Sequence, residues 1–133
     1  MDIAKTGLVC GLAMVLASGA PAQQIQSEQY QLDGVLVTIL PHDFLSEEEL
    51  MTLRLVGQNR DALSIFLPQG DGFAALAVAP NEGFVRAGQP VDSAHIMAGL
   101  PDVSAARAAA LAECNGARSG GPACEIVLEV APR

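Results

Sequence analysis

The closing segment of the chain reads Asp102-Val-Ser-Ala-Ala-Arg-Ala-Ala-Ala-Leu-Ala-Glu-Cys-Asn-Gly116, then a glycine-rich loop, then Cys124-Glu-Ile-Val-Leu-Glu-Val130. The first part favours a helix, because alanine, leucine, arginine and glutamate fill residues 105–113 without glycine, proline or β-branched residues. Asp102 or Ser104 can accept hydrogen bonds from the first free amides, and Asn115-Gly116 offers a stop. The segment therefore predicts a helix, a short loop and a strand, around which a small domain is organised.

Residues 124–130 alternate in the way that favours a half-buried strand. One set of side chains, all apolar, is predicted to face the core: Cys124, Ile126, Leu128 and Val130. The other set is predicted to point away from it: Glu125, Val127 and Glu129. The helix gives no equally strong signal, because alanines cover several of its sides, and the sequence leaves its buried face open.

Two cysteines stand at the ends of the loop between the predicted helix and the predicted strand. Cys114 and Cys124 enclose a stretch with too little apolar content to hold its own shape. A bridge between them would restrain the unfolded chain and add about 3 kcal/mol of stability on the chain-entropy model. We therefore expect a disulfide, the alternative being two unrelated buried thiols.

The N-terminal residues have the layout of a secretory signal peptide, 1–22. A short region with Lys5 precedes an apolar stretch at 7–20, and Ala20-Pro-Ala22 offers a small-residue cleavage site. The apolar stretch is shorter than the about 20 residues that a membrane span needs. We therefore expect cleavage rather than an uncleaved anchor. The predicted mature protein is periplasmic or secreted, without a stable membrane span, and disulfides persist in those compartments.

The sequence is acidic, with a formal net charge of −8, and its only lysine is Lys5 in the predicted signal peptide. A mature chain without lysine cannot form a side-chain Schiff base with a substrate or with pyridoxal phosphate. The acidic balance, the single tyrosine and the lack of tryptophan provide neither the basic surface nor the stacking groups of nucleic-acid binders. We expect no cofactor and no nucleic-acid partner, and the sequence leaves the oligomeric state open.

The front half of the predicted domain contains one strand and one capped helix. Residues 23–34 are rich in glutamine and are expected to be a disordered lead-in, whereas the β-branched run 35–40 is expected to be a strand. The run Ser46-Glu-Glu-Glu49 matches a capping box that opens a helix ending at Val56, with Gly57 as its stop. We attribute the three acids to the favourable effect of negative charge at the positive end of the helix dipole. A cation site is not expected, because consecutive side chains point in different directions around a helix.

The back half is expected to consist mostly of strands. Residues 62–67 are apolar without distinguishing helix from strand, and 68–72 is a break. A strand is expected at 73–79, with 84–87 returning as its hairpin partner, and a further strand at 93–98. These elements predict an α+β fold: a small antiparallel sheet with one or two packed helices, in which the back-half helix covers one face. The expected single disulfide-stapled domain spans 35–133, with a front part at 33–67 and a back part at 73–130.

No residue pattern points to a specific reaction. His42, next to Asp43, has no further nitrogen or sulfur ligand at a useful spacing, so we expect no metal site. His95 is expected to be a partly buried strand residue. A small hydrolase that uses aspartate, glutamate and His42 is an alternative, because folding can bring carboxylates together. Arg107, on its alanine-coated helix, is the candidate binding residue, and the alternative is a solvated or acid-paired arginine.

The back half resembles a family of small secreted bacterial proteins. The resemblance rests on three stretches: Phe73-Ala-Ala-Leu-Ala-Val-Ala-Pro-Asn-Glu-Gly83, Ala105-Ala-Arg-Ala-Ala-Ala-Leu-Ala-Glu-Cys-Asn115 and Ala123-Cys-Glu-Ile-Val-Leu-Glu-Val130. The helix pattern Ala-Ala-Arg-x-x-Ala-Leu-x-x-Cys and a second cysteine opening the last strand are similar to the domain-of-unknown-function family DUF4189. The resemblance implies no catalytic residues. Some relatives are named 5-aminolevulinate synthases, but that reaction needs a Schiff-base lysine, which the predicted mature chain lacks.

These features favour a secreted or periplasmic, non-enzymatic module that binds a protein or a cell-envelope component. The motivation is a small, stapled, acidic domain without a reactive set of side chains. The alternatives are a small envelope hydrolase and a small-ligand carrier, for which an alanine-rich helix leaves room above a sheet.

Overall fold

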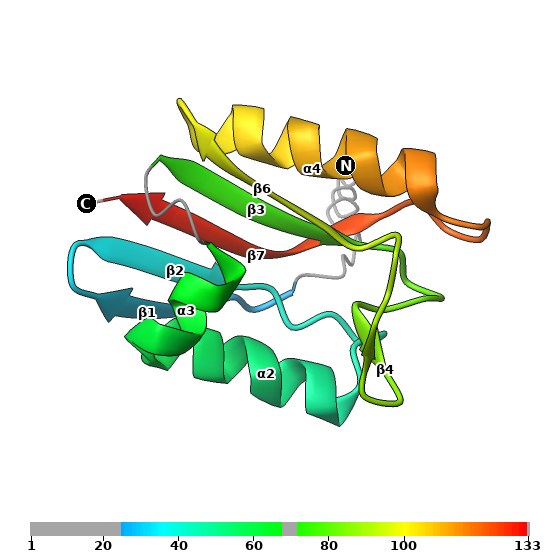
Figure 1. Cartoon of the computed structure of the whole chain (residues 1–133), viewed down its shortest axis with the longest axis horizontal. Helices are drawn as coiled ribbons and strands as arrows, with labels where there is room; N and C mark the ends of the chain where they lie inside the picture. The colour runs from blue at the N-terminus through cyan, green and yellow to red at the C-terminus, as the bar shows by residue number, and fades with distance from the viewer. Residues whose placement is uncertain (1–24, 68–71, 133) are drawn as a thin grey trace, which may run out of the picture.

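The chain folds around one five-stranded antiparallel sheet with helices on both faces (Figure 1). The structure is a computed structural model that describes residues 25–67 and 72–132. The strands are β1 (Glu28–Leu32), β2 (Val35–Ile39), β3 (Phe73–Val78), β4 (Val85–Arg86), β5 (Gln89–Pro90), β6 (His95–Leu100) and β7 (Glu125–Pro132). The helices are α2 (Glu47–Gln58), α3 (Arg60–Phe66) and α4 (Val103–Ala117). The predicted signal peptide, 1–22, lies outside the described residues.

The strand order in the sheet is β1-β2-β7-β3-β6, and β4 and β5 form a separate hairpin. This architecture confirms the predicted α+β class with an antiparallel sheet. The structure has three helices where one or two were expected, and the back-half helix, α4, covers one face of the sheet as predicted. Within 25–67 and 72–132, no helix combines the length and the apolar character that a membrane crossing requires.

The helices on the two faces of the sheet are offset from one another. α4 packs over β3, β6 and β7, whereas α2 packs on the opposite face beside β1 and β2 (Figure 1). Each face therefore has a covered half and a half without a helix directly above it. This offset decides where the molecule has hollows.

The core under α4 is made of small side chains. Ala75 and Ala77 of β3 meet Ala106 and Ala110 of α4, and all four are fully buried. Small residues let a helix backbone approach a sheet closely, and Ala106 and Ala110 share one helix face because they are four residues apart. The structure thus settles the buried face that the sequence left open.

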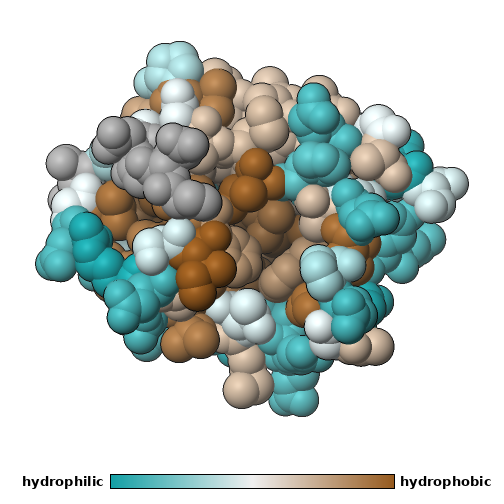
Figure 2. All heavy atoms as spheres, viewed as in Figure 1, coloured by the Kyte–Doolittle hydropathy of each residue, from teal (hydrophilic) through white to brown (hydrophobic). Residues whose placement is uncertain are grey.

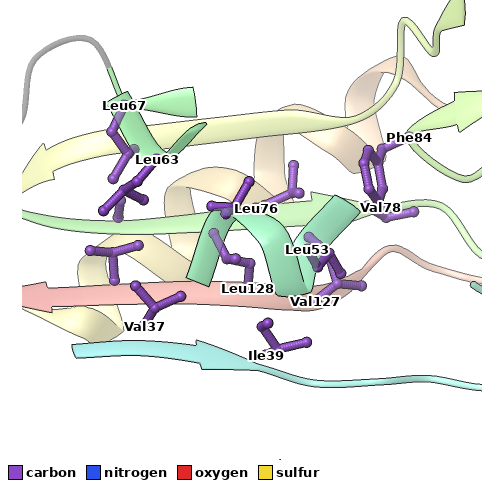
Figure 3. Packing of buried hydrophobic residues seen from close by; sticks show 13 residues of the cluster. Val37, Ile39, Leu53, Leu63, Leu67, Leu76, Val78, Phe84, Val127 and Leu128 are labelled. Carbon is purple, nitrogen blue, oxygen red and sulfur yellow. The ribbon is translucent and has the colours of Figure 1, made fainter. Parts of the chain in front are cut away.

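The core under α2 and α3 is made of larger side chains. Ile39, Leu53, Val127 and Leu128 are fully buried and point toward one another between the helices and the sheet (Figure 3). Burying side chains of this size stabilises the fold by about 1.5–3 kcal/mol each. This core packs α2 and α3 against the sheet.

A bulge in β7 corrects the predicted alternation of its side chains. Leu76 of β3 pairs with Leu128, but the next residue, Ala77, pairs with Ile126, which leaves Val127 as an extra residue. Ile126 consequently faces α4, whereas Val127 and Leu128 both face the larger core. All four residues predicted to face the core are buried, but the bulge divides them between the two faces, because strand side chains alternate with a period of two.

Residues 23–34 were expected to be disordered, and this expectation was wrong for the part that forms β1. Residues 28–32 form that strand, which pairs along its length with β2. Both oxygens of Glu28 accept hydrogen bonds from Arg54 of α2, at 2.9 and 2.6 Å. Tyr30 and Leu32 pack against the larger core. These two apolar side chains give the polar stretch enough burial to be ordered.

Replacing Gly57 by alanine is expected to destabilise the protein, although alanine normally stabilises a helix interior over glycine by about 1 kcal/mol. A Cβ atom at Gly57 would lie 2.7 Å from Cδ2 of Tyr30, so the ring would have to move. We expect a loss of about 1–3 kcal/mol in the free energy of unfolding, measured by urea titration. Gly116→Ala is the matched control, because nothing lies within 4 Å of its Cβ position. Equal effects of the two substitutions would contradict this packing.

The remaining elements differ from expectation mainly in their partners and ends. The sequence did not distinguish helix from strand for residues 62–67, and the structure places most of them in the helix α3. The segment 84–87 does not return along β3, because β4 pairs with β5 while β3 pairs with β6 and β7. Both long helices run past their predicted stops, to Gln58 and Ala117.

Candidate binding groove

The segment between β3 and β6 is fixed to α2 by one buried carboxylate. Glu49 is 0% exposed, and its Oε2 accepts hydrogen bonds from the backbone N–H groups of Phe84 and Val85, at 2.7 and 2.9 Å. Arg86 donates to the same carboxylate from Nε and Nη2. A Cβ atom at Gly83 would collide with both Arg86 and Glu49, so the chain needs glycine there. Residues 83–86 are thereby held against the start of α2.

The pKa of Glu49 reflects two opposed influences. Burial by itself raises the pKa of a carboxyl group, because it disfavours the charged form. Three backbone N–H groups and the Arg86 guanidinium donate to the carboxylate and outweigh burial, so the pKa of Glu49 lies below its ordinary value. The third N–H belongs to Ser46, whose hydroxyl accepts in return from the backbone N–H of Glu49. The predicted capping box is confirmed, and the same carboxylate also serves a tertiary contact.

A second carboxylate holds the other end of this segment. Glu82 accepts from the Ser93 hydroxyl at 2.6 Å and from the backbone N–H of Ser119 at 2.8 Å. The hydrogen bond from Ser93 is the main reason why the pKa of Glu82 lies below its ordinary value. Ser119 lies in the loop closed by the Cys114–Cys124 disulfide, which the structure confirms. The disulfide loop therefore supports the segment that connects β3 and β6.

An open groove lies on the helix-free half of the face that carries α2 and α3. We call it the apolar groove; it has a volume of about 460 Å³. Its lining residues come from the two helices, from β3 and β6, and from the connecting segment: Glu48, Thr52, Ile65, Phe66, Leu76, Phe84, Val85, Pro90, Val91, Ala94 and Ile96. Figure 2 shows a hollow near the middle of this face with hydrophobic residues around it.

Two aromatic rings join the walls of the apolar groove. Phe66 of α3 meets Phe84 of the connecting segment edge to face, with ring centroids 6.4 Å apart. Aromatic pairs of this geometry add about 0.5–1.5 kcal/mol beyond the area that they bury. Together with Glu49, the pair links α2, α3 and the connecting segment. The groove therefore has walls that are held in place rather than a surface of loose side chains.

A second hollow surrounds His42. It has a volume of about 560 Å³, and His42, Asp43 and Glu125 are among its lining residues. The His42 ring stacks on Phe44 with centroids 5.0 Å apart, and its Nε2 lies 2.9 Å from the backbone oxygen of Ile126. A carbonyl oxygen only accepts, so Nε2 carries the proton and donates. The structure thus brings His42 and two carboxylates to one hollow.

The candidate binding residue Arg107 is engaged by an acid. Its Nε and Nη2 donate to the two carboxylate oxygens of Glu129, and this hydrogen bonding raises the pKa of Arg107. The arrangement matches the acid-paired alternative. His95 is partly buried in β6, as predicted, and its Nδ1 lies 2.9 Å from the backbone oxygen of Ser93. The part of the chain that the structure describes contains no group of three or more histidines, cysteines or acids placed to hold a metal ion.

No local sequence pattern pointed to the apolar groove. In the sequence, the capping box fully explains the presence of Glu49, so nothing there indicated its contact with residues 84–86. The hollow itself forms between α2, α3, β3, β6 and the connecting segment, which are distant in the sequence. No family model, curated protein or solved structure matches the chain.

Proposed function

We propose that the chain is a secreted or periplasmic, non-enzymatic module that binds a protein or a cell-envelope component through the apolar groove. One observation carries the proposal: an open hydrophobic hollow whose walls are fixed by Glu49 and by the Phe66–Phe84 pair. Its volume of about 460 Å³ falls within the about 300–1,000 Å³ of ligand sites. The Cys114–Cys124 disulfide suits an oxidising compartment. The same helix-to-strand bridge supports the proposed kinship with the DUF4189 family.

The exposed rim residue Ile65 supports binding at this groove in particular. Its side chain is 78% exposed, more than the other large exposed hydrophobic residues of the described chain. Single exposed apolar residues are common on protein surfaces. Ile65, however, stands beside a hollow that is itself apolar, and contiguous apolar surface marks interaction sites. A partner that covered the groove would bury Ile65 as well.

A small hydrolase is the second candidate function, favoured by the hollow that gathers His42, Asp43 and Glu125. The main-chain contact at Nε2 orients the ring and leaves Nδ1 as the nitrogen that can act as a base. Ser46 is not available as its nucleophile, because its hydroxyl caps α2. Turnover of an envelope substrate that disappears in a folded His42→Ala variant would favour this function over the binding module.

Ile65→Gln is expected to abolish capture of a companion by the tagged mature chain in envelope extract of the source organism. The substitution removes the exposed apolar group at the groove rim without disturbing a buried side chain. Leu55→Gln is the matched control, because Leu55 is also an exposed helix residue, at 55%, and does not line the groove. The measurement is mass spectrometry of everything that co-elutes, with the two variants and the unchanged chain side by side.

The companion should be retained at stoichiometric level by the unchanged chain and by Leu55→Gln. Retention of the same companion by Ile65→Gln would contradict binding at the groove. A solitary monomer in all three samples would contradict a protein partner. A co-purified small molecule in native mass spectra, lost only in Ile65→Gln, would identify a ligand carrier.

A further inference from the structure

β6 lies at one edge of the sheet and pairs only with β3. Among the described residues, no backbone hydrogen bond from another segment reaches the outer side of this strand. β6 has one extra residue relative to β3 before Leu100, and Gly99 there has a φ of +77°. The regular extended part of this edge is therefore His95–Ala98. An extended peptide binds such an edge through the unpaired N–H and C=O groups of its backbone.

The two edges of the sheet differ in how they resist added strands. β1, at one edge, carries the ion-paired Glu28 and two glutamines. β6, at the other edge, has neither a charged residue nor a proline. Proteins usually guard free edges with charged side chains or proline. The edge that lacks these protective residues, β6, is the one beside the apolar groove.

The direction of the β6 side chains connects its edge to the groove. Ile96 lines the groove, and Ala98 packs on the same face, whereas Met97 packs on the opposite face under α4. Neighbouring strands lie about 4.8 Å apart, and their side chains alternate between the two faces. A strand added to β6 would therefore place every second side chain on the face of Ile96, at the open side of the groove.

The charges around the groove select the chemistry of that strand. Glu48 lines the groove, and Asp92 lies beside the lining residue Val91; both acids are exposed and have no ion-pair partner among the described residues. The whole chain carries a formal charge of −8. A second copy of the chain would bring two acidic rims together, which is unfavourable, whereas lysine or arginine on a partner complements them.

We infer that the apolar groove and the free edge of β6 together take an extended segment of a partner protein whose side chains on the groove face include both apolar and basic residues. The segment adds to the sheet as a sixth strand. Its side chains on the face of Ile96 are apolar where they cover the groove and basic where they approach Glu48 and Asp92. The inference rests on the proposed function and specifies the partner of that same site.

The test uses a fluorescent ten-residue peptide in which every second residue is threonine and the intervening residues, which share one face, are valine and lysine in turn. Its anisotropy is measured with the mature chain. A second peptide replaces each lysine by glutamate. A third carries N-methyl groups on every other residue, along one edge, so that this edge cannot donate hydrogen bonds to β6. We expect saturable binding of the first peptide that weakens with added salt, binding about tenfold weaker for the N-methylated peptide, and no binding of the acidic one.

Two matched pairs of variants locate the binding. Ile65→Gln should weaken binding about tenfold while Leu55→Gln leaves it unchanged, because only Ile65 lines the groove. Glu48→Gln should weaken binding and reduce its salt dependence, whereas Glu113→Gln, an equal change of charge on α4, should do neither.

Equal affinity for the N-methylated peptide would overturn strand addition, and equal affinity for the acidic peptide would overturn the charge selection. A dimer in sedimentation without peptide that dissociates in Ile65→Gln would show that the occupant is a second copy. If the extract yields a companion that depends on Ile65 while the valine–lysine peptide fails to bind, the inference fails and the proposed function stands. If neither the companion nor the peptide binds, both fail.

Discussion

Glu49→Gln is expected to lower the free energy of unfolding by about 3 kcal/mol, the upper scale for leaving a buried donor without its partner. Glutamine has nearly the same shape, but it replaces one acceptor oxygen by a donating NH₂ group. That group would face backbone N–H groups, such as those of Phe84 and Val85, which now donate to the carboxylate. Arg86 would also lose its acidic partner, although its side chain is 44% exposed and water can solvate part of it.

The dependence on pH gives this prediction its specific signature. A carboxyl whose pKa is lowered by folding stabilises the native state above its unfolded pKa, and that stability is lost as pH falls through the folded value. The difference between the unchanged chain and Glu49→Gln should therefore be largest above about pH 5 and shrink as the medium becomes more acidic. Urea titrations between neutral and acidic pH measure it.

The control for this prediction is the adjacent acid. Glu48→Gln removes the same charge from an exposed position and should change stability by less than about 0.5 kcal/mol. Equal losses for Glu48→Gln and Glu49→Gln would mean that the helix dipole, rather than the contact with residues 84–86, accounts for the effect. That outcome would contradict the description of the groove wall.

Replacing both Cys114 and Cys124 by serine is expected to lower the free energy of unfolding by about 3 kcal/mol, as removing a constraint on a short loop should. The bridge joins the end of α4 to the start of β7 across a sequence separation of 10. The loss should extend beyond the loop, because Ser119 within it donates to Glu82, which also holds Ser93. We expect faster amide hydrogen exchange in residues 82–93 as well as in the loop.

Reductant provides the control for the disulfide prediction. Dithiothreitol should lower the stability of the unchanged chain toward that of the double serine variant, and should leave the double variant unaffected. A double variant as stable as the oxidised chain would contradict the stabilising role of the bridge. Normal exchange at 82–93 would contradict the link between the loop and the groove.

Local signals in the sequence were enough to predict several elements. α4 follows from its helix-forming residues and from Asp102, whose carboxylate accepts from the backbone N–H of Ala105 at 2.8 Å. The capping box of Ser46 and Glu49 forms both of its hydrogen bonds. The disulfide was predictable because its cysteines flank a loop that has no core of its own. Each of these features depends on residues close together in the chain.

The features that sequence reasoning missed depend on distant residues. The side chain of Leu128 turns away from that of Ile126 because β7 must match β3 across a bulge. The strand β1 is ordered by contacts of Tyr30 with the core beneath α2, and a glutamine-rich stretch carries no local sign of them. The groove forms only when α2, α3, β6 and the connecting segment have all been placed.

Hydrogen exchange of the predicted mature chain, with and without a companion from envelope extract, tests the proposed binding site most directly. Binding in the apolar groove predicts slower exchange in α3 and in residues 84–98, with no change around residues 41–44. Slower exchange confined to the hollow of His42, or no change anywhere in the chain, would contradict it.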